Sequence, residues 1–375
     1  MKILLHAGGS YGDVSPYITL AVKLKELGHE PIMVVPRENI NDCQRHGIPS
    51  FGYIDFNIAE SVWDTYEGFI YWCLTRLMRD SLISANAIMQ FSVGAELVIS
   101  HPLCPIGSMI SEYYKIPIVD LLISAAYLEE SDRSDNFFNS NWLENINDCR
   151  FSLGLKPVEY TSLSCMRNDN LKITLYPREL IGGVENSNLV YANFIQYYQD
   201  SEIPDELEEF LSDSSPLAVT LGQSIGFLTA PLNFMQVIED YASLGNKVIV
   251  FSETYTSDNK NIFVCQGTSP HHKIFPRCSA VINHGGIGTI AKCLESNTPQ
   301  IIVPQMSENA KNAEYFRHFC GVISPDEFNL EKLKSVLASS FYDLEEGSKY
   351  SSILNNTNGM QIILETLRNH KYLYE

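Results

Sequence analysis

The stretch INHGGIGTIAKCLESNTPQIIVP, residues 282–304, decides the fold of this chain. The run SAVINH that leads into it is typical of a buried strand, IAKCLES has helical spacing, and QIIVPQ is a second strand. This order is the βαβ unit of a parallel sheet. Glycine at a helix start costs stability. We therefore infer that a ligand approaches the backbone closely at Gly285, Gly286 and Gly288.

The glycine turn has the features of an anion site. The first N–H groups of a helix have no partner within the helix, and the helix dipole places partial positive charge there. Glycines let a phosphate reach these groups. His284 can donate a hydrogen bond to the same anion, and Thr289 adds a hydroxyl. The spacing is neither GxxxxGK[ST] nor GxGxxG, which argues against P-loop NTPases and dinucleotide dehydrogenases. On the residues alone, a tight turn with a backbone-bonded histidine stays an alternative.

Short apolar runs alternate with helical segments on both sides of this unit, and they predict an α/β chain. The runs are KILLHA, PIMVVP, SFGYI, ELVISH and IPIVDLLIS in the first half, and LAVTLGQ, KVIVFSE and NIFVCQG in the second. The pattern predicts two Rossmann-like domains that face a cleft, because such sheets bind ligands beyond the carboxyl ends of their strands. The expected boundaries are 1–195, a linker at 196–214, 215–350, and a C-terminal helix at 351–375 that packs back across the junction.

Composition excludes several functions. The formal charge of −19 (26 Lys+Arg against 45 Asp+Glu) argues against nucleic acid as a partner. Nine cysteines are scattered without a CxxC pair, which favours reduced, buried thiols. Neither a membrane span nor a signal peptide is expected, so we predict a cytoplasmic protein. Peripheral membrane contact and oligomeric state stay open.

The segment CSAVINHGGIGTIAKCLESNTPQIIVPQMSENAKNAEYF resembles the donor-binding signature of GT-B type glycosyltransferases. The similarity is greatest to bacterial enzymes that glycosylate antibiotics and lipids, and to sterol glucosyltransferases. GGSYGDVSPYITLAVKLKELGHE, residues 8–30, resembles the opening of the same group, GxxGDVxPxxxLAxxLxxxGH. LVISHPLCPIGSMISEYYKIPIV and LGLKPV lie between them in the expected order. The resemblance thus covers most of the chain.

The resemblance implies a role for each motif. The C-terminal domain would bind a UDP- or dTDP-sugar as co-substrate, with no further cofactor, and the N-terminal domain a small, apolar acceptor. The diphosphate would contact His284, Gly285, Gly286, Gly288, Thr289 and Ser224. His271, in the loop before the glycine strand, is a weak candidate for the nucleotide base region, since an exposed loop residue is commonly only solvated.

The sequence departs from the family after Pro304. Many members have Asp-Gln about four residues on, in contact with the transferred sugar, where this chain has Glu308-Asn309. A carboxylate and an amide remain, and each side chain differs in length by one methylene. Contact with the sugar is therefore still expected, although the sugar need not be glucose. Asn312 also matches a frequent asparagine of the segment, although an asparagine on a helix face is commonly solvated.

Asp13, between the first strand and first helix, is the candidate general base. The alternative is a helix N-cap. Asp120 could assist and His6 fits a core or wall position, so both stay outside the catalytic set. An aromatic group with helical spacing could bind the acceptor or simply be core: Trp63, Tyr66, Phe69 and Trp72.

The chain contains no Asp-x-Asp, the usual metal–diphosphate motif of the other major glycosyltransferase fold, so no metal is expected. The hypothesis is an inverting, metal-independent glycosyltransferase. Two alternatives stay open: a sugar-nucleotide epimerase on the same fold, and a non-catalytic nucleotide-sugar-binding protein that supports a partner enzyme.

Overall fold

In the computed structural model the chain forms two compact units. Unit 1 consists of Met1–Tyr197 and Asn358–Glu375, and unit 2 of Tyr198–Thr357. The structure describes residues 1–54, 75–76, 78–128, 132–161, 168–195, 202–222, 234–267, 269–305, 307–339 and 342–374. Within these ranges, no helix has the length and hydropathy that a membrane crossing requires.

Unit 1 is built on a seven-stranded parallel sheet with the order β3-β2-β1-β4-β5-β6-β7. The central pairs are in register, with His6 of β1 opposite Val34 of β2 and Ser100 of β4. The strand order reverses between β1 and β4, so the switch point of the sheet lies at the end of β1. The strands are β1 (Lys2–His6), β2 (Glu30–Val35), β3 (Ser50–Gly52), β4 (Leu97–Ser100), β5 (Ile118–Leu122), β6 (Leu171–Thr174) and β7 (Leu189–Tyr191).

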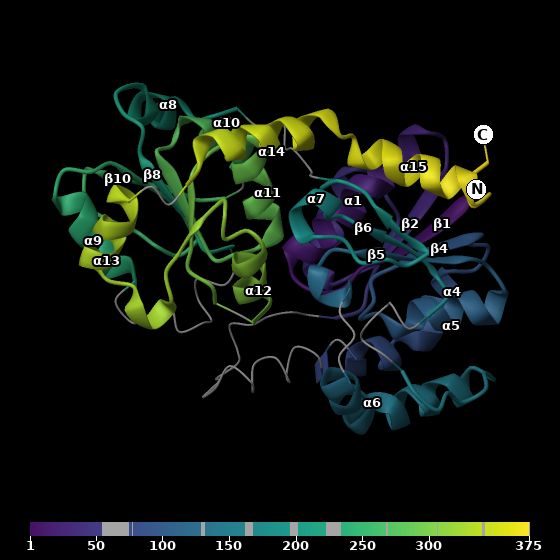
Figure 1. Ribbon diagram of the computed structural model, residues 1–375. Helices are drawn as coiled ribbons and strands as arrows, with labels where there is room; N and C mark the ends of the chain where they lie inside the picture. The colour runs from purple at the N-terminus through teal and green to yellow at the C-terminus, as the bar shows by residue number, and fades with distance from the viewer. Residues whose placement is uncertain are drawn as a thin grey trace. The chain divides into compact units, whose positions relative to one another are not determined.

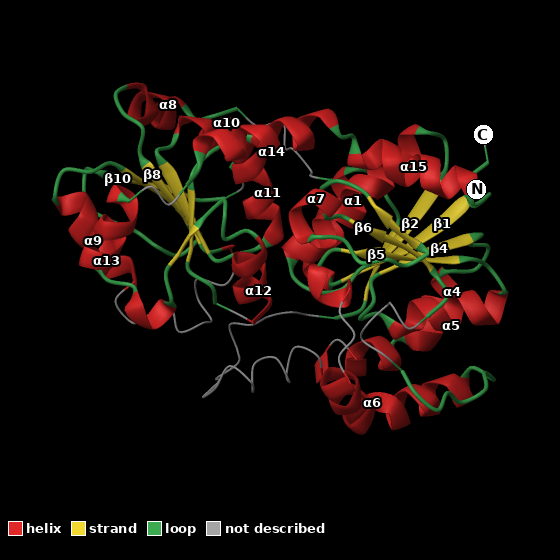
Figure 2. Cartoon of the chain, in the orientation of Figure 1, coloured by secondary structure: helices red, strands yellow, loops and turns green. Residues whose placement is uncertain are grey.

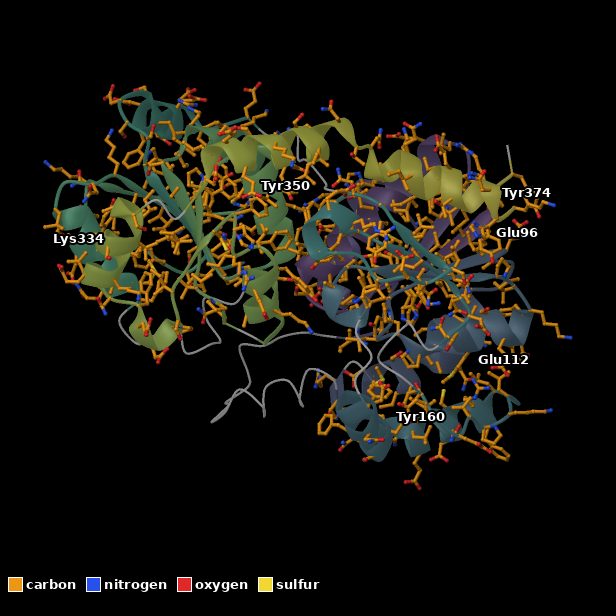
Figure 3. All side chains as sticks on the ribbon, viewed as in Figure 1. Glu96, Glu112, Tyr160, Lys334, Tyr350 and Tyr374 are labelled. Atoms are coloured by element: carbon orange, nitrogen blue, oxygen red, sulfur yellow. The ribbon has the colours of Figure 1, made fainter. Side chains whose placement is uncertain are left out.

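Helices cover both faces of this sheet (Figures 1 and 2). α1 and the C-terminal α15 lie on one face, and α4 and α5 on the other. The long helix α6 is tied to α5 by a 2.7 Å ion pair between Arg150 and Glu112, the second of which is labelled in Figure 3. The helices are α1 (Tyr11–Glu26), α2 (Ile40–Arg45), α4 (Ala85–Phe91), α5 (Pro105–Tyr114), α6 (Asp132–Ser152), α7 (Arg178–Ile181) and α15 (Gly359–Asn369), with 3-10 turns η1 (Arg37–Asn39) and η3 (Ala125–Leu128).

Unit 2 repeats the architecture on a six-stranded parallel sheet with the order β10-β9-β8-β11-β12-β13. Its switch point lies between β8 and β11, where Thr220 pairs with Asn283. The strands are β8 (Leu217–Thr220), β9 (Val248–Phe251), β10 (Ile262–Cys265), β11 (Ala280–Asn283), β12 (Gln300–Ile302) and β13 (Gly321–Val322). The helices are α8 (Asp205–Ser212), α9 (Phe234–Ser243), α10 (His271–Ile274), α11 (Ile287–Glu295), α12 (Ser307–Tyr315), α13 (Leu330–Ala338) and α14 (Leu344–Asn356), with η6 (Phe275–Arg277) and η7 (Pro325–Glu327).

The structure gives more detail for two connections. The segment expected as a linker at 196–214 includes α8, whose Leu207 and Leu211 are buried, because their spacing gives this acidic helix one apolar face. The helix expected over 351–375 is two helices, since α14 ends at Asn356 and α15 begins at Gly359. Asn358 caps α15 by accepting a hydrogen bond from the backbone N–H of Gln361.

Three strands that the apolar runs did not indicate are β6, β7 and β13. β6 reads LKIT, and its Lys172 and Thr174 are buried. The Lys172 ammonium donates 2.7 Å hydrogen bonds to the carbonyl oxygens of Asn168 and Asn170, which compensates its burial. Because polar residues interrupt the apolar run, the hydropathy pattern does not predict such a strand.

Candidate functional site

The glycine turn lies at the switch point of the unit 2 sheet. Buried β11 leads into His284 and then into Gly285, whose φ of +90° is in the left-handed region that glycine tolerates best. Gly286 is the N-cap of α11, and no side chain of the described residues caps this helix or places a negative charge in its first turn. The orphan N–H groups and the positive dipole end are therefore available to an anion.

Gly285 is fixed from three sides. Its N–H donates a 2.8 Å hydrogen bond to Oδ1 of Asn283, and its carbonyl accepts a 2.9 Å bond from Nδ2 of Asn312 on α12. A methyl group on Gly285 would lie 2.9 Å from the backbone oxygen of Asn309. Because the N–H of Gly285 already donates to Asn283, this residue shapes the turn. Its carbonyl oxygen joins the turn to α12 through the bond from Asn312. Asn312 is thus buried and hydrogen-bonded, and the alternative of a merely solvated asparagine is wrong.

The His284 ring lies in a slot formed with two glycines. A methyl group on Gly286 would lie 2.5 Å from its Nε2, and one on Gly222, beyond the end of β8, would lie 2.9 Å from its Cε1. Burial lowers the pKa of His284 to about 4, against a smaller opposing effect of the Thr220 carbonyl. The imidazole is therefore neutral at pH 7, with Nε2 beside the N-cap of α11.

Gly288 differs from its two neighbours in the motif. It is exposed, its φ is outside the left-handed region, and a methyl group there would meet no atom within 4 Å. Packing among the described residues therefore gives no reason for glycine, whereas a ligand against the first turn of α11 would. Thr289, next along the helix, is partly exposed, and its N–H donates to the Gly286 carbonyl at 3.0 Å.

Asp13 lies at the third position of α1 in unit 1. Its Oδ2 accepts hydrogen bonds from the backbone N–H of Ser10 at 2.6 Å and from the Ser10 hydroxyl at 2.9 Å. Gly9, with φ +111°, makes room for the carboxylate, since a methyl group there would lie 2.3 Å from Oδ2. The helix begins at Tyr11, and Ser10 and Asp13 stabilise its start.

His6 and His101 are buried beneath the carboxyl edge of the unit 1 sheet. Both nitrogens of His6 are without a hydrogen-bond partner among the described residues, and its ring packs edge-on to Tyr53 at 5.5 Å. His101 Nδ1 accepts from the Leu103 N–H at 3.1 Å, so its neutral ring carries the proton on Nε2. Burial lowers the pKa of each to about 3, and in His6 the neighbouring His101 adds to the effect. His6 is thus enclosed in the core.

Asp120 is also buried, in the middle of β5. It accepts hydrogen bonds from Nδ2 of Asn168 at 3.0 Å and of Asn170 at 3.1 Å. Burial raises its pKa despite these bonds and the nearby Lys172 ammonium. The carboxylate therefore serves a buried polar network of β5 and β6.

His271 begins α10 and is not an exposed loop residue. Its ring lies 4.5 Å from that of Phe251 and 4.8 Å from that of Phe275, and its Nε2 is buried without a hydrogen-bond partner among the described residues. Burial lowers its pKa to about 3, with a smaller contribution from the Lys292 ammonium. The alternative of a merely solvated histidine is therefore wrong, because two aromatic side chains flank the ring.

Several predicted site residues lie outside the described residues. Ser224 is one, and the expected acceptor-binding aromatics Trp63, Tyr66, Phe69 and Trp72 are the others. The backbone of Glu308 lies in α12, but its side chain is not described. The described parts show no group of three His, Cys, Asp or Glu side chains placed to hold a metal ion.

The sequence interpretation missed Gly222 and Asn283, which shape the turn. Gly222 follows β8 in LAVTLGQ, and only the pairing of β8 with β11 brings it to His284. Asn283, the last residue of β11, reads as part of an apolar run although its amide bonds Gln300 at 3.0 Å and Gly285. The sequence carries no signal of this network.

Comparison with known proteins places this geometry in context. No family model matches the sequence. The chain is 25% identical over 349 residues to dTDP-epi-vancosaminyltransferase of Amycolatopsis orientalis, covering 84% of this chain and 82% of that protein. It is 24% identical over 354 residues to vancomycin aglycone glucosyltransferase of the same organism, covering 82% of each.

Solved structures agree with these relatives. The glycosyltransferase SsfS6 of Streptomyces sp. SF2575, complexed with thymidine diphosphate, superposes with a TM-score of 0.72 at 18% identity, over 98% of this chain and 99% of that one. The calicheamicin glycosyltransferase CalG4 gives 0.74 at 16% identity, over 98% and 97%. The chain is thus related over most of its length to nucleotide-sugar-dependent glycosyltransferases of the antibiotic type, and its fold is their GT-B fold.

Proposed function

We propose that the chain is an inverting, metal-independent glycosyltransferase that moves a sugar from a UDP- or dTDP-sugar to a small, apolar natural-product or lipid acceptor. One observation carries the proposal. At the switch point of unit 2, an uncapped helix start lies beside the neutral imidazole of His284 and an unobstructed Gly288. This arrangement suits the diphosphate that leaves during sugar transfer.

The leaving group determines the chemistry required in unit 2. When the bond between the anomeric carbon and the diphosphate oxygen breaks, its electron pair adds negative charge to the diphosphate. The start of α11 and a hydrogen bond from the His284 ring would stabilise that charge without rearrangement, because the surrounding glycines already fix both groups. Thr289 and Ser224 would complete the contacts to the diphosphate. The α12 residues Glu308 and Asn309 would contact the transferred sugar.

The acceptor requires a base, for which Asp13 in unit 1 is the candidate. Its carboxylate would accept the proton of the acceptor hydroxyl as the oxygen bonds the anomeric carbon from the face opposite the diphosphate, which inverts the configuration. The hydrogen bonds from Ser10 fix the carboxylate in one orientation. The same bonds also explain Asp13 as a purely structural helix cap, and this observation favours the non-catalytic binding protein as the second candidate.

The nature of the donor is supported by the relatives alone. One relative is named as a dTDP-epi-vancosaminyltransferase, and one solved structure of similar fold is a complex with thymidine diphosphate. The structure places His271 between Phe251 and Phe275 before the glycine strand, the region in which we propose that the base binds.

The first test is calorimetric titration of UDP, dTDP, GDP and ADP into the wild type, His284→Ala and, as control, His318→Ala, whose exposed side chain lies at the end of the α12 segment. We expect selective binding of UDP or dTDP that weakens in His284→Ala and is retained in His318→Ala. Absence of binding by all four would contradict the proposal.

Turnover separates the alternatives. A glycosyltransferase releases nucleoside diphosphate in proportion to glycosylated acceptor, an epimerase converts the donor sugar with no acceptor present, and a silent binding protein does neither. The assay uses UDP- and dTDP-hexoses with a panel of phenolic, sterol and peptide acceptors. Donor binding without turnover for every acceptor would favour the binding protein.

A further inference from the structure

We propose that Gly222 is a positioning residue for sugar transfer. Because it has no side chain, it leaves room for the His284 imidazole in the orientation that puts Nε2 beside the first turn of α11. This inference rests on the proposed function, in which that ring contacts the leaving diphosphate. It assigns a role to a residue that lies 62 positions before the histidine in the sequence.

The contacts that carry the inference join two glycines to one ring. A methyl group on Gly222 would lie 2.9 Å from Cε1, 3.4 Å from Nε2 and 3.5 Å from Nδ1 of His284. A methyl group on Gly286 would lie 2.5 Å from Nε2 and 2.8 Å from Cε1. Carbon atoms in contact stay about 3.5–4 Å apart, so a side chain on either glycine would move the ring.

The sheet supplies the positions of the two glycines. Thr220 at the end of β8 pairs with Asn283 at the end of β11. The residues that follow the two strands therefore lie next to each other at the same edge of the sheet. Gly222 then turns with φ +63°. The contact between Gly222 and the His284 ring therefore depends on the pairing of two strands.

A fixed ring has a catalytic consequence. A histidine on a mobile loop would lose rotamer freedom each time it met the diphosphate, whereas the ring between Gly222 and Gly286 is already oriented. Because the ring is neutral, its contribution to the diphosphate depends on the direction of one N–H bond, and a small displacement removes it. A cationic side chain would tolerate such a displacement better.

The test is a double-mutant cycle on nucleoside diphosphate binding. Gly222→Ala should raise the Kd for the preferred diphosphate by at least about tenfold, the usual size for a lost hydrogen bond to a charged group. The corresponding nucleoside, which has no phosphate, should bind unchanged. In a His284→Ala background the Gly222→Ala change should have little effect, since no ring remains to be displaced.

Gly245→Ala is the matched control. Gly245 also has a positive φ, +95°, but a methyl group there would meet nothing within 4 Å. Both substitutions therefore strain the backbone, and only Gly222→Ala contacts a histidine ring. Equal loss of binding in Gly245→Ala, or equal loss from Gly222→Ala in both His284 backgrounds, would overturn the positioning role.

A ligand-free measurement separates this inference from the proposed function. The ring resonances of His284, assigned by comparison with His284→Ala, should shift in Gly222→Ala and stay in place in Gly245→Ala. If the wild type binds no diphosphate and the shift occurs, the slot exists and the glycosyltransferase proposal fails. If diphosphate binds and the resonances do not move in Gly222→Ala, the positioning role fails alone.

Discussion

Asp13 and Ser10 are joined by two hydrogen bonds at the start of α1, both of which Oδ2 of Asp13 accepts, from the Ser10 N–H at 2.6 Å and from its hydroxyl at 2.9 Å. These bonds stabilise the helix start and orient the carboxylate at the carboxyl end of β1. A structural cap and a general base therefore make different demands on the same group: the cap needs an acceptor oxygen, and the base needs to take a proton.

Asp13→Asn separates these two demands. The amide oxygen can still accept from the Ser10 N–H, so the midpoint of thermal unfolding should change little, while kcat for sugar transfer should fall by about 10²–10⁴-fold through loss of the base. Asp13→Ala removes the cap as well and should also lower the free energy of unfolding by about 1 kcal/mol. Equal activity of Asp13→Asn and wild type would assign the carboxylate to the cap alone.

Gly288→Ala tests whether the motif serves a ligand. The substitution meets no atom within 4 Å and replaces glycine by a better helix former, so the free energy of unfolding should stay the same or rise by about 0.4–1 kcal/mol. Nucleoside diphosphate should nevertheless bind more weakly, because the methyl group would stand where the phosphates approach the helix. Calorimetric and denaturant titrations measure the two effects, and unchanged affinity would mean that the ligand does not touch this turn.

Asn312→Ala tests the bond between α12 and the glycine turn. Loss of its Nδ2 leaves the buried carbonyl of Gly285 without that hydrogen bond, at an expected cost of about 1–3 kcal/mol in the free energy of unfolding. Asn356→Ala is the control, since this asparagine is exposed on α14 and, among the described residues, its side chain bonds Ser352 Oγ at 3.1 Å. Urea unfolding of both variants checks the difference, and equal stability would show that the α12 bond contributes nothing.

Acid should destabilise the protein through four histidines whose pKa values are lowered by burial of the ring. The folded pKa is about 3 for His6, His101 and His271 and about 4 for His284, all below the ordinary value of 6.5. Between these values the unfolded chain binds more protons than the folded chain, so stability is fully present above pH 6.5 and falls toward pH 4. Each histidine contributes up to about 1.4 kcal/mol per pH unit in that window.

His6→Leu isolates one of these contributions. Because neither ring nitrogen has a hydrogen-bond partner among the described residues, the apolar replacement should leave stability at pH 7.5 unchanged or higher. It should also reduce the slope of stability against pH below 6.5 relative to the wild type. Urea unfolding at several pH values gives the slopes, and an unaltered slope would place the His6 pKa near its ordinary value.

Gly359→Ala should weaken the attachment of α15 to unit 1. A methyl group on Gly359 would lie 2.3 Å from the carbonyl oxygen of Asn193, so the helix must shift, at a cost of about 1–3 kcal/mol. Gly12→Ala, also in the first turn of a helix, would meet only Ser10 Oγ at 3.7 Å and should be neutral in stability. Thermal unfolding compares the pair, and equal midpoints would contradict the close contact.

The parallel sheets and the glycine turn could be predicted because they depend on local patterns. KILLHA, SAVINH and QIIVPQ are apolar runs of strand length, and a run of this kind has few alternatives to a buried strand when helices flank it. β6 could not be predicted in this way, because it contains a lysine. Lys172 can be buried since its ammonium donates hydrogen bonds to two carbonyl groups that lie beside it in the folded chain.

By itself, the sequence determined the α/β alternation, the turn of His284, Gly285 and Gly286 between strand and helix, and the position of Asp13 near a helix start. These follow from neighbours within a few residues. Only the tertiary structure decided that Gly222 forms a wall of the His284 slot, that Asn312 bonds Gly285, and that His271 lies between two phenyl rings. The physical reason is that steric exclusion, hydrogen bonding and burial act between atoms close in space, and strand pairing brings together residues that sequence spacing separates.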